Sequence, residues 1–561
     1  MHNNRITFLY LIICLVISVP LFMLVFNGVQ YPYIFFDEKF YIELAQSFHK
    51  YRTFIYEGNQ QHTSRALYAI IISTFFAFKQ FTTSFRAIQV FNNAVYALSA
   101  IPVFLITTKL IDNQNKLTYA FLISIAFIVM PARLYANTAM PESLFLLFFL
   151  WLFYFTWQFL CKRQFWSAFS AFVFFILAFF TKQQIVIIVP AVFITLLVEL
   201  FFNKKKKLMI FLLAGIFILI SIIVIFYRRK FIPAHYFNLF SINLNHLLLN
   251  WKSFIAQILM LGWICGLLPF LFLIRAVLNL RKLSKRQRIF TVLSFSMIVI
   301  LWIATSLYIV YISEIYNAVS LFSRYYICIT PLLLISLTLN SQNLISQTYR
   351  NLICSGRANF LSRARKLIQI GAAITIFCCL TAYILPAFVA KRVDGNALSI
   401  SGWHIKDKPL YFSAVLIGGF LFVWAMSQLF LSGNLKIYAL IIGMLVLTIV
   451  ASIRQKRYSS SISIPAIAIS KMIDINVPGN APLVYVGGKY DKSLFLTEIL
   501  SPRHSKRFPG VKDNKHFLQN IFSPKFFKNV TYVLAPTNYK LPVKPVSQTN
   551  EYSLYKLKMV Q

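Results

Sequence analysis

Long apolar segments recur along most of this chain, and they constrain its fold more than any single motif does. A helix needs about 20 apolar residues to cross a hydrocarbon core of about 30 Å. Segments of about this length are predicted to span a membrane near residues 6–26, 87–108, 117–131, 143–160, 165–181, 185–202, 208–227, 253–274, 289–311, 325–340, 367–388, 409–431 and 436–453. The sequence therefore predicts an all-α polytopic membrane protein with about thirteen transmembrane helices within residues 1–453.

The composition supports a membrane protein and argues against a nucleic-acid-binding one. Hydrophobic residues make up 59% of the chain and charged residues only 12%, whereas soluble proteins usually have about 25% charged residues. The formal net charge is +40, but Lys and Arg occur in short clusters between the apolar segments. Such clusters are typical of loops that face anionic lipid. We therefore expect contact with membrane lipid and no nucleic-acid partner.

The basic clusters also predict which loops face the cytoplasm, because Lys and Arg are enriched in cytoplasmic loops. The stretch 67–78 has only about 12 residues, which suits an interfacial or re-entrant helix better than a span. If it does not span, these clusters fall on the cytoplasmic side: Lys109 with Lys116, Lys162 with Arg163, Lys204–Lys207, Arg281–Arg288 and Arg357–Lys366. The cluster Arg228–Lys230 does not fit this assignment. The topology makes residues 27–86 a first external loop of a multi-pass cell-membrane protein.

Residues 454–561 are predicted to form a small extracytoplasmic α/β domain. The stretches PLVYVGG (482–488), TYVLAP (531–536) and YSLYKLKMV (552–560) are typical of strands. The stretch DKSLFLTEIL (491–500) is typical of a helix. The predicted fold is thus a membrane-embedded helical domain followed by a soluble domain.

Two adjacent carboxylates lie just after the first apolar segment, in a chain with 15 acidic and 55 basic residues. In FFDEKFYIELAQSF, Phe40, Leu44 and Phe48 recur at helical spacing, which predicts a helix along the membrane surface. Asp37 could cap that helix and Glu38 could favour its dipole. The pair could instead provide a general base, or position a hydroxyl group or a metal ion. The residues alone leave both interpretations open.

A second acidic residue, Glu142, lies in the loop MPARLYANTAMPES (130–143) together with Arg133. This loop joins two predicted spans on the external side. Pro131 and Pro141 are consistent with a turn, and Glu142 could cap the next helix. A functional role for Glu142 and Arg133 is the alternative.

Two further segments place cations at the same predicted side. Lys182 lies between apolar runs in AFFTKQQIVIIVP, where a lysine must reach the interface, form a pair or bind an anionic ligand. The segment SEIYNAVSLFSRYYICITP carries Glu314, Arg324 and Tyr325 at the external ends of two spans. Arg324 could bind phosphate with two hydrogen bonds or pair with Glu314. Together these segments suggest a site for an anionic lipid.

Several of these segments resemble the GT-C glycosyltransferases, especially the branch of protein O-mannosyltransferases and lipid A aminoarabinose transferases. DEKFYIELAQSF resembles the first external loop of that branch. TSRALYAIIISTFFAF (63–78) stands where the branch has a surface helix, followed by a span that begins with Arg86. FFTKQQ (179–184) resembles its TKG segment, and SRYYICITP (323–331) resembles its RY segment with a later proline. The likeness extends over about residues 6–340.

The resemblance implies a sugar donor linked to polyprenyl phosphate and a lipid, glycan or protein acceptor at the extracytoplasmic face. It implies that Asp37 takes the acceptor proton with Glu38 beside it in the catalytic site. The implied donor phosphate ligands are Lys182, Arg324 and Tyr325. Residues implied to orient the acceptor or a metal are Glu142, Arg133 and Arg65. A divalent cation is compatible with this site, and no other cofactor is implied.

The sequence departs from the branch at three places. Gln183 replaces the usual glycine, Ser64-Arg65 stands in place of a double proline, and Glu142 stands where aspartate is common. These departures concern the sugar and the acceptor rather than the class of enzyme. The chief alternative is a transporter or flippase of lipid-linked sugars. Transporters usually have ionisable residues in the middle of spans, whereas the candidate residues here are at predicted span ends.

Overall fold

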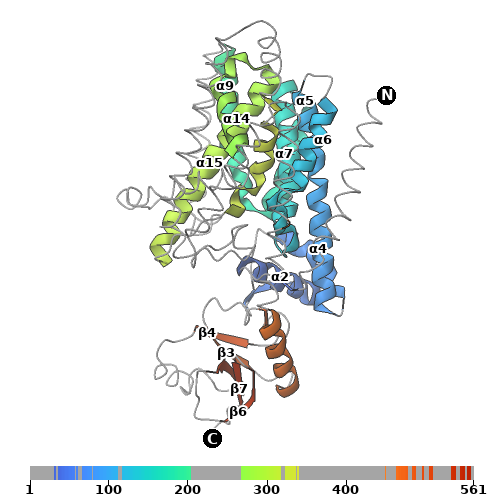
Figure 1. Cartoon of the computed structure of the whole chain (residues 1–561), viewed down its shortest axis with the longest axis vertical. Coiled ribbons are helices and arrows are strands. Elements are labelled where there is room, and N and C mark those ends of the chain that lie inside the picture. The colour runs from blue at the N-terminus through green and yellow to red at the C-terminus, as the bar shows by residue number, and fades with distance from the viewer. Residues whose placement is uncertain are drawn as a thin grey trace, which may run out of the picture. The chain divides into compact units, whose positions relative to one another are not determined.

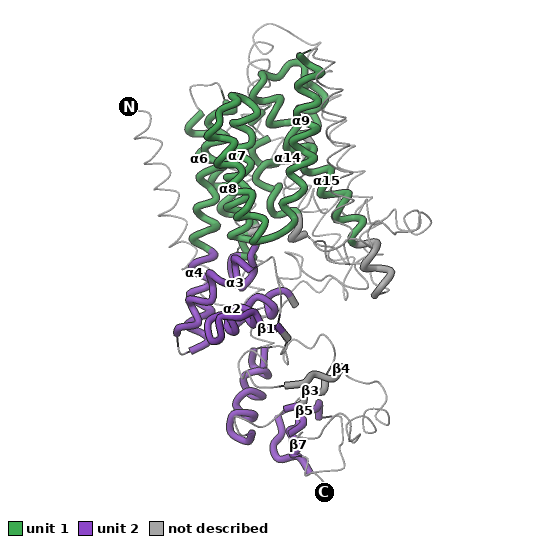
Figure 2. The backbone as a smooth tube through the Cα atoms, turned by 180° about the vertical axis from the view of Figure 1, so that it is seen from behind, with its two compact units in different colours: residues 1–25, 93–135, 142–451 green, residues 26–92, 136–141, 452–561 purple. Residues whose placement is uncertain are grey.

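The computed structural model shows a helical bundle and a small mixed sheet (Figure 1). It describes residues 31–32, 36–56, 59–60, 66–78, 80–111, 116–203, 267–316, 323–336, 338–339, 449, 463–477, 483–487, 496–497, 505–509, 532–537, 544–549 and 552–556. The chain divides into two compact units (Figure 2). Unit 1 comprises residues 1–25, 93–135 and 142–451, and unit 2 comprises residues 26–92, 136–141 and 452–561.

Unit 1 is a bundle of apolar helices. Its α-helices are α5 (Ala100–Leu110), α6 (Lys116–Ile128), α7 (Glu142–Lys162), α8 (Phe165–Thr181), α9 (Ile188–Phe202), α14 (Leu267–Leu278) and α15 (Lys285–Tyr316), together with the end of α4 (Phe81–Leu98). Short 3-10 helices connect them: η2 (Pro131–Asn137), η3 (Gln183–Ile187), η5 (Leu280–Lys282) and η6 (Ser323–Ile329). Helices α5 and α6 pack together, as do α7 and α8, and α9 and α15.

Four helices in the described part are long and apolar enough to cross a membrane. They are Phe81–Leu110, which comprises α4 and α5, Glu142–Lys162, Gln183–Phe202, which comprises η3 and α9, and Lys285–Tyr308. The bundle core between them is rich in aromatic side chains. Fully buried Trp157 donates a hydrogen bond of 3.1 Å from Nε1 to the Arg286 carbonyl oxygen, which joins α7 to α15.

Helices occur in the described parts of the predicted spans, and the predicted span 325–340 begins within the 3-10 helix η6. Two further differences concern the spans 87–108 and 117–131. Residues 87–108 belong to two helices, α4 and α5, which meet at Ser99. Pro102 explains the break, because it has no N–H group to donate to the Leu98 carbonyl. The second difference is that α6 ends at Ile128 and the chain continues as η2, so the predicted span 117–131 is shorter than expected. The predicted spans 6–26, 208–227, 367–388 and 409–431 lie outside the described residues, as do residues 253–266 of the span 253–274 and nearly all of 436–453.

The N-terminal part of unit 2 is a small helical layer with a hairpin. Its elements are α2 (Phe36–Tyr51), β1 (Ile55–Tyr56), β2 (Asn59–Gln60), α3 (Ala66–Ser73), η1 (Thr74–Ala77) and the start of α4. Strands β1 and β2 pair antiparallel. Buried Tyr41 of α2 packs edge-on against buried Tyr68 of α3, with ring centroids 5.5 Å apart. The predicted surface helix after Asp37 and the short helix near residues 67–78 therefore form and pack together.

The C-terminal part of unit 2 contains a five-stranded mixed sheet. Its strands are β3 (Leu483–Gly487), β4 (Ser505–Pro509), β5 (Tyr532–Pro536), β6 (Pro545–Gln548) and β7 (Tyr552–Lys556), in the order β4-β3-β5-β7-β6. The pairs β3–β4 and β3–β5 are parallel, and β5–β7 and β6–β7 are antiparallel. A helix over residues 463–476 packs Ile469 and Met472 against the sheet. Strands β3, β5 and β7 lie within the three predicted strand stretches, whereas β4 and β6 were not predicted. The predicted helix 491–500 lies outside the described residues except for residues 496–497.

Candidate functional site

Glu142 and Lys182, which were both predicted to lie on the external side, form an ion pair in unit 1. Helices α7 and α8 form an antiparallel pair, so the start of α7 meets the end of α8. Glu142 is the first residue of α7, and Lys182 is a single extended residue between α8 and η3. The Lys182 Nζ atom lies 3.1 Å from Glu142 Oε1. The two predicted residues, separated by 40 positions, therefore form an ion pair.

This ion pair is buried, but it leaves hydrogen-bonding capacity unused. The side chains of Glu142 and Lys182 are 4% and 14% exposed. Among the described residues, Glu142 Oε2 and the neighbouring Ser143 hydroxyl have no hydrogen-bond partner. Lys182 Nζ also lies 5.8 Å from the centroid of the Phe145 ring. A buried carboxylate oxygen without a donor costs free energy, so the pair is suited to receive a hydroxyl group or a cation from a ligand.

The segment after Lys182 lies beside the segment that carries Arg324 and Tyr325. Gln184 of η3 donates a hydrogen bond from Nε2 to Cys328 Sγ of η6, at 3.7 Å. Helix η6 also packs against α7. Arg324 and Tyr325 are the second and third residues of η6, and their side chains lie outside the described part of the structure, as does that of Glu314. The backbone thus brings together two segments that were separately predicted to bind donor phosphate.

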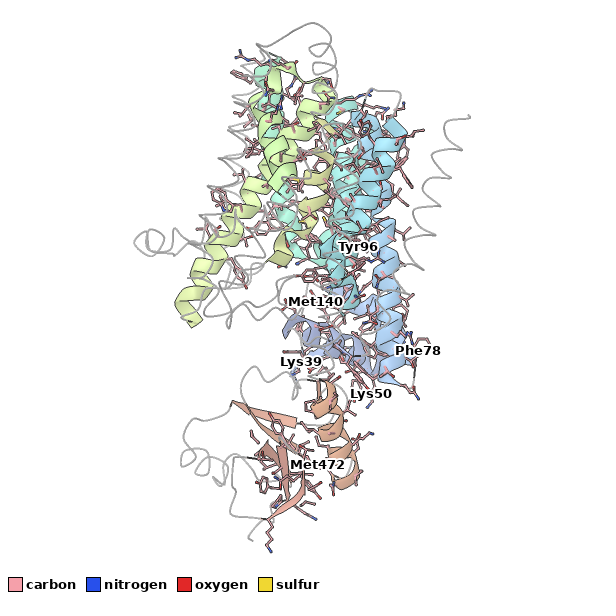
Figure 3. The ribbon with its side chains drawn as sticks, in the orientation of Figure 1. Lys39, Lys50, Phe78, Tyr96, Met140 and Met472 are labelled. Atoms are coloured by element: carbon pink, nitrogen blue, oxygen red, sulfur yellow. The ribbon has the colours of Figure 1, made fainter. Side chains whose placement is uncertain are left out.

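Arg133 of η2 is buried in unit 1 and contacts residues of α4. Its side chain is 2% exposed, and Nε donates a hydrogen bond of 3.2 Å to Asn93 Oδ1. The guanidinium carbon lies 5.8 Å from the centroid of the Tyr96 ring, and Tyr96 is labelled in Figure 3. Burial removes water from the guanidinium and lowers the pKa of Arg133 well below its ordinary value. These contacts support the fold of the loop, while a role toward the acceptor or a metal stays a prediction.

The two adjacent carboxylates of α2 have different environments within unit 2. Helix α2 begins at Phe36, so both residues lie in its first turn, where a negative charge favours the helix dipole. Asp37 is partly exposed, whereas Glu38 is fully buried. Glu38 Oε1 accepts a hydrogen bond of 2.8 Å from the backbone N–H of Ala139. Of the two, Asp37 is the carboxylate that solvent or a substrate can reach.

Lys39 follows this pair and is also buried, at 1% exposure. Its Nζ lies 3.3 Å from Glu43 Oε1 and 5.6 Å from the centroid of the Tyr56 ring. Lys39 is labelled in Figure 3. The lysine charge is therefore balanced within the helix and its hairpin.

Sequence reasoning missed two residues on α4, Gln89 and Asn92. Their amide groups donate hydrogen bonds to the backbone of residues 137 and 138 in the loop before α7. The signal was present in the sequence, since amide side chains in a predicted apolar span need partners. Arg65 lies outside the described residues. No group of three or more His, Cys, Asp or Glu residues that could hold a metal ion occurs in the described part of the chain, so the divalent cation stays a prediction.

The opposite end of the unit 1 bundle gathers basic residues. Lys285 Nζ donates to the Cys161 carbonyl at 3.3 Å, and Gln287 Nε2 donates to the Leu110 carbonyl at 3.1 Å. Arg288 holds Glu199 of α9 with hydrogen bonds of 2.6 and 3.1 Å. The ends of α5, α7 and α9 thus meet the start of α15. The described clusters among those that the positive-inside rule assigned to one side, Lys109 with Lys116, Lys162 with Arg163 and Arg281–Arg288, lie at this end of the bundle.

Comparison with known proteins identifies the fold. No family model matches the chain, and no curated protein matches it in sequence. The fold is that of the GT-C glycosyltransferases, as the sequence resemblance predicted. The solved structures that the chain resembles include those of ArnT, a lipid A aminoarabinose transferase, from Cupriavidus metallidurans. With ArnT bound to undecaprenyl phosphate the TM-score is 0.54 at 13% identity, covering 97% of each chain. With apo ArnT it is 0.51 at 12% identity, covering 99% of this chain and 98% of that one.

Proposed function

We propose that this protein is an integral membrane glycosyltransferase that moves a sugar from a polyprenyl-phosphate-linked donor to an acceptor at the extracytoplasmic face. The observation that carries the proposal is the placement of the Lys182 segment beside the Arg324 and Tyr325 segment, in a fold shared with ArnT. One solved ArnT structure has undecaprenyl phosphate bound. Lysine and arginine are the side chains that bind phosphate groups most strongly. The arrangement supports a donor phosphate site formed by Lys182, Arg324 and Tyr325.

The proposed reaction needs one base and several cations. The acceptor hydroxyl oxygen attacks the anomeric carbon of the sugar, and Asp37 takes the proton from that hydroxyl. The bond between the anomeric carbon and the phosphate oxygen breaks. Polyprenyl phosphate leaves with both electrons as a dianion, which needs no proton because the second phosphate pKa is about 6. The cations stabilise the charge that grows on the leaving phosphate, and Glu142 Oε2 orients the acceptor or a metal.

The test is Asp37→Asn in the purified full-length protein, reconstituted in liposomes. The assay supplies polyprenyl-phosphate hexoses and pentoses with envelope lipid, glycan and protein acceptors, and follows release of polyprenyl phosphate by mass spectrometry. A positioned general base contributes about 10²- to 10⁴-fold in rate, so Asp37→Asn should lose transfer by that factor. Asparagine has nearly the same size, so membrane insertion should be unchanged.

Glu43→Gln is the matched control, because Glu43 lies on the same helix and its carboxylate pairs with Lys39. It should retain transfer. Normal transfer by Asp37→Asn would refute the base assignment. Movement of the lipid-linked sugar across the bilayer without release of polyprenyl phosphate would favour a flippase instead.

A further inference from the structure

Three side chains bind three consecutive residues of one loop in unit 2. Gln89 Nε2 donates a hydrogen bond of 3.0 Å to the Asn137 carbonyl. Asn92 Nδ2 donates one of 2.7 Å to the Thr138 carbonyl. Glu38 Oε1 accepts one of 2.8 Å from the Ala139 N–H group. Each contact is to a backbone atom, so together the three contacts hold the loop backbone in place whatever side chains the loop carries.

These contacts provide hydrogen-bond partners to backbone groups of the loop. Residues 138–140 are bends that belong to neither a helix nor a strand, and Thr138, Ala139 and Met140 are fully buried. Buried backbone groups outside regular structure need side-chain partners or water. Asn92 is itself fully buried and also donates to the Tyr68 hydroxyl at 2.9 Å, which ties α3 to the same network. Met140 is labelled in Figure 3.

The burial of Glu38 argues for a structural use of its carboxylate. A general base exchanges protons with its surroundings, but Glu38 has an exposure of 0% and one oxygen held by a backbone N–H group. Its neighbour Asp37 is the partly exposed member of the pair. The two adjacent acids thus have separate tasks, one toward solvent and one toward the loop.

We propose that Glu38, Gln89 and Asn92 are positioning residues that clamp the backbone of residues 137–139 and fix the chain three positions before Glu142. The kinetic consequence rests on the proposed glycosyl transfer, whereas the structural consequence does not. Because the clamp uses Glu38 only as a hydrogen-bond acceptor, glutamine can replace it with its amide oxygen. A catalytic or metal-binding carboxylate could not be replaced in this way.

The experiment measures hydrogen exchange at the Ala139 amide by mass spectrometry, on the full-length protein in lipid nanodiscs. Glu38→Ala should raise the exchange rate about tenfold or more, because it removes a charged acceptor from a buried N–H group. Glu38→Gln should stay within about threefold of the unmodified protein on the same scale. Gln89→Glu, which removes a donor of the clamp while keeping the side-chain size, should also raise the rate. Lys50→Gln, at an exposed position of the same helix, is the control and should leave the rate unchanged.

Transfer rates are measured on the same samples. If Glu38 is a positioning residue, kcat should fall in Glu38→Ala and be close to the original value in Glu38→Gln. The variant with faster exchange at Ala139 should therefore also be the one with the lower kcat. An unchanged exchange rate in Glu38→Ala would overturn the proposal. If Glu38→Ala does not fold, an unchanged rate in Gln89→Glu would do the same. Loss of transfer in Glu38→Gln as complete as in Asp37→Asn, with normal exchange, would make Glu38 catalytic. Failure of transfer in every sample would count against the proposed function. The exchange rates would still test whether Glu38 and Gln89 hold the backbone of residues 137–139.

Discussion

Two buried carboxylates of unit 1, Glu142 and Glu199, each pair with a cation at opposite ends of the same helical bundle. Arg288 uses two nitrogens to fill both oxygens of Glu199, at 2.6 and 3.1 Å. Lys182 contacts one oxygen of Glu142 at 3.1 Å, and the other oxygen has no hydrogen-bond partner in the described residues. The two pairs do not differ in the burial of the cation, because the side chains of Lys182 and Arg288 are both 14% exposed. The pairs differ in whether the carboxylate is satisfied.

This difference separates a structural pair from one suited to a ligand. A bidentate contact between arginine and a carboxylate fixes geometry as well as charge. The Arg288 guanidinium carbon also lies 4.5 Å from the centroid of the Phe202 ring, so its position is determined on several sides. Lysine is a compact charge on a flexible stem and can exchange one anionic partner for another. The contact of Lys182 with Glu142 is thus compatible with the proposed role of Lys182 at the donor phosphate.

Of the variants that test this difference between the two pairs, Glu142→Gln should have the largest effect. This change keeps the size of the side chain and removes the charge that faces both Lys182 and the proposed acceptor. Misplacement of an acceptor or metal by about 1 Å can reduce the rate about 10²-fold, and we expect a loss of that order in kcat/KM. The measurement is release of polyprenyl phosphate at several acceptor concentrations.

Glu199→Gln is the matched control for that variant, since it changes the same group at the opposite end of the bundle. It should transfer sugar at nearly the original rate. Equal losses in the two variants would show that the unsatisfied oxygen of Glu142 has no special part in transfer.

A smaller effect should follow from Lys182→Ala. The variant removes the proposed charged contact to the donor phosphate, and a contact of this kind is worth about 1.5–3 kcal/mol. The donor KM should therefore rise at least about tenfold. Lys109→Ala is the control, because Lys109 bonds to the Tyr154 hydroxyl near the other end of α7. Its donor KM should be unchanged.

The double variant of Glu142→Gln and Lys182→Ala distinguishes two roles of the lysine. If Lys182 binds phosphate, its removal raises the donor KM in the Glu142→Gln background as well. If Lys182 serves only to hold Glu142, the double variant will match Glu142→Gln alone, and the phosphate assignment fails.

The sequence was a good guide to elements defined by local pattern. Helix α8 has the predicted bounds of 165–181, because an apolar run ends there at polar residues on both sides. The GT-C fold was predicted from short motifs and agrees with the ArnT structures. The break at Ser99 was missed, because a proline three positions later acts through a hydrogen bond that only a helix defines.

Contacts between distant segments could not be predicted in the same way. Glu142 and Lys182 were each identified as candidates, but nothing in their local sequence shows that they face each other across 40 residues. Glu38 was expected beside Asp37 in the catalytic site, and only the fold reveals its contact with Ala139, 101 positions away. The identity of a site residue can be local information, whereas its partner depends on the fold.

The smallest effect on transfer, and the clearest effect on stability, should come from Glu199→Gln. The change leaves Arg288 buried with a weaker acceptor, and losing hydrogen bonds to a charged group costs about 1–3 kcal/mol. Thermal unfolding in nanodiscs should therefore begin a few degrees lower. Glu142→Gln should lower the unfolding temperature less, because Lys182 makes one contact to Glu142 and its flexible stem lets the ammonium reach water. If Glu142→Gln instead destabilises the protein more than Glu199→Gln, the Glu142 pair is the structural one, and the assignment of the two ends of the bundle must be reversed.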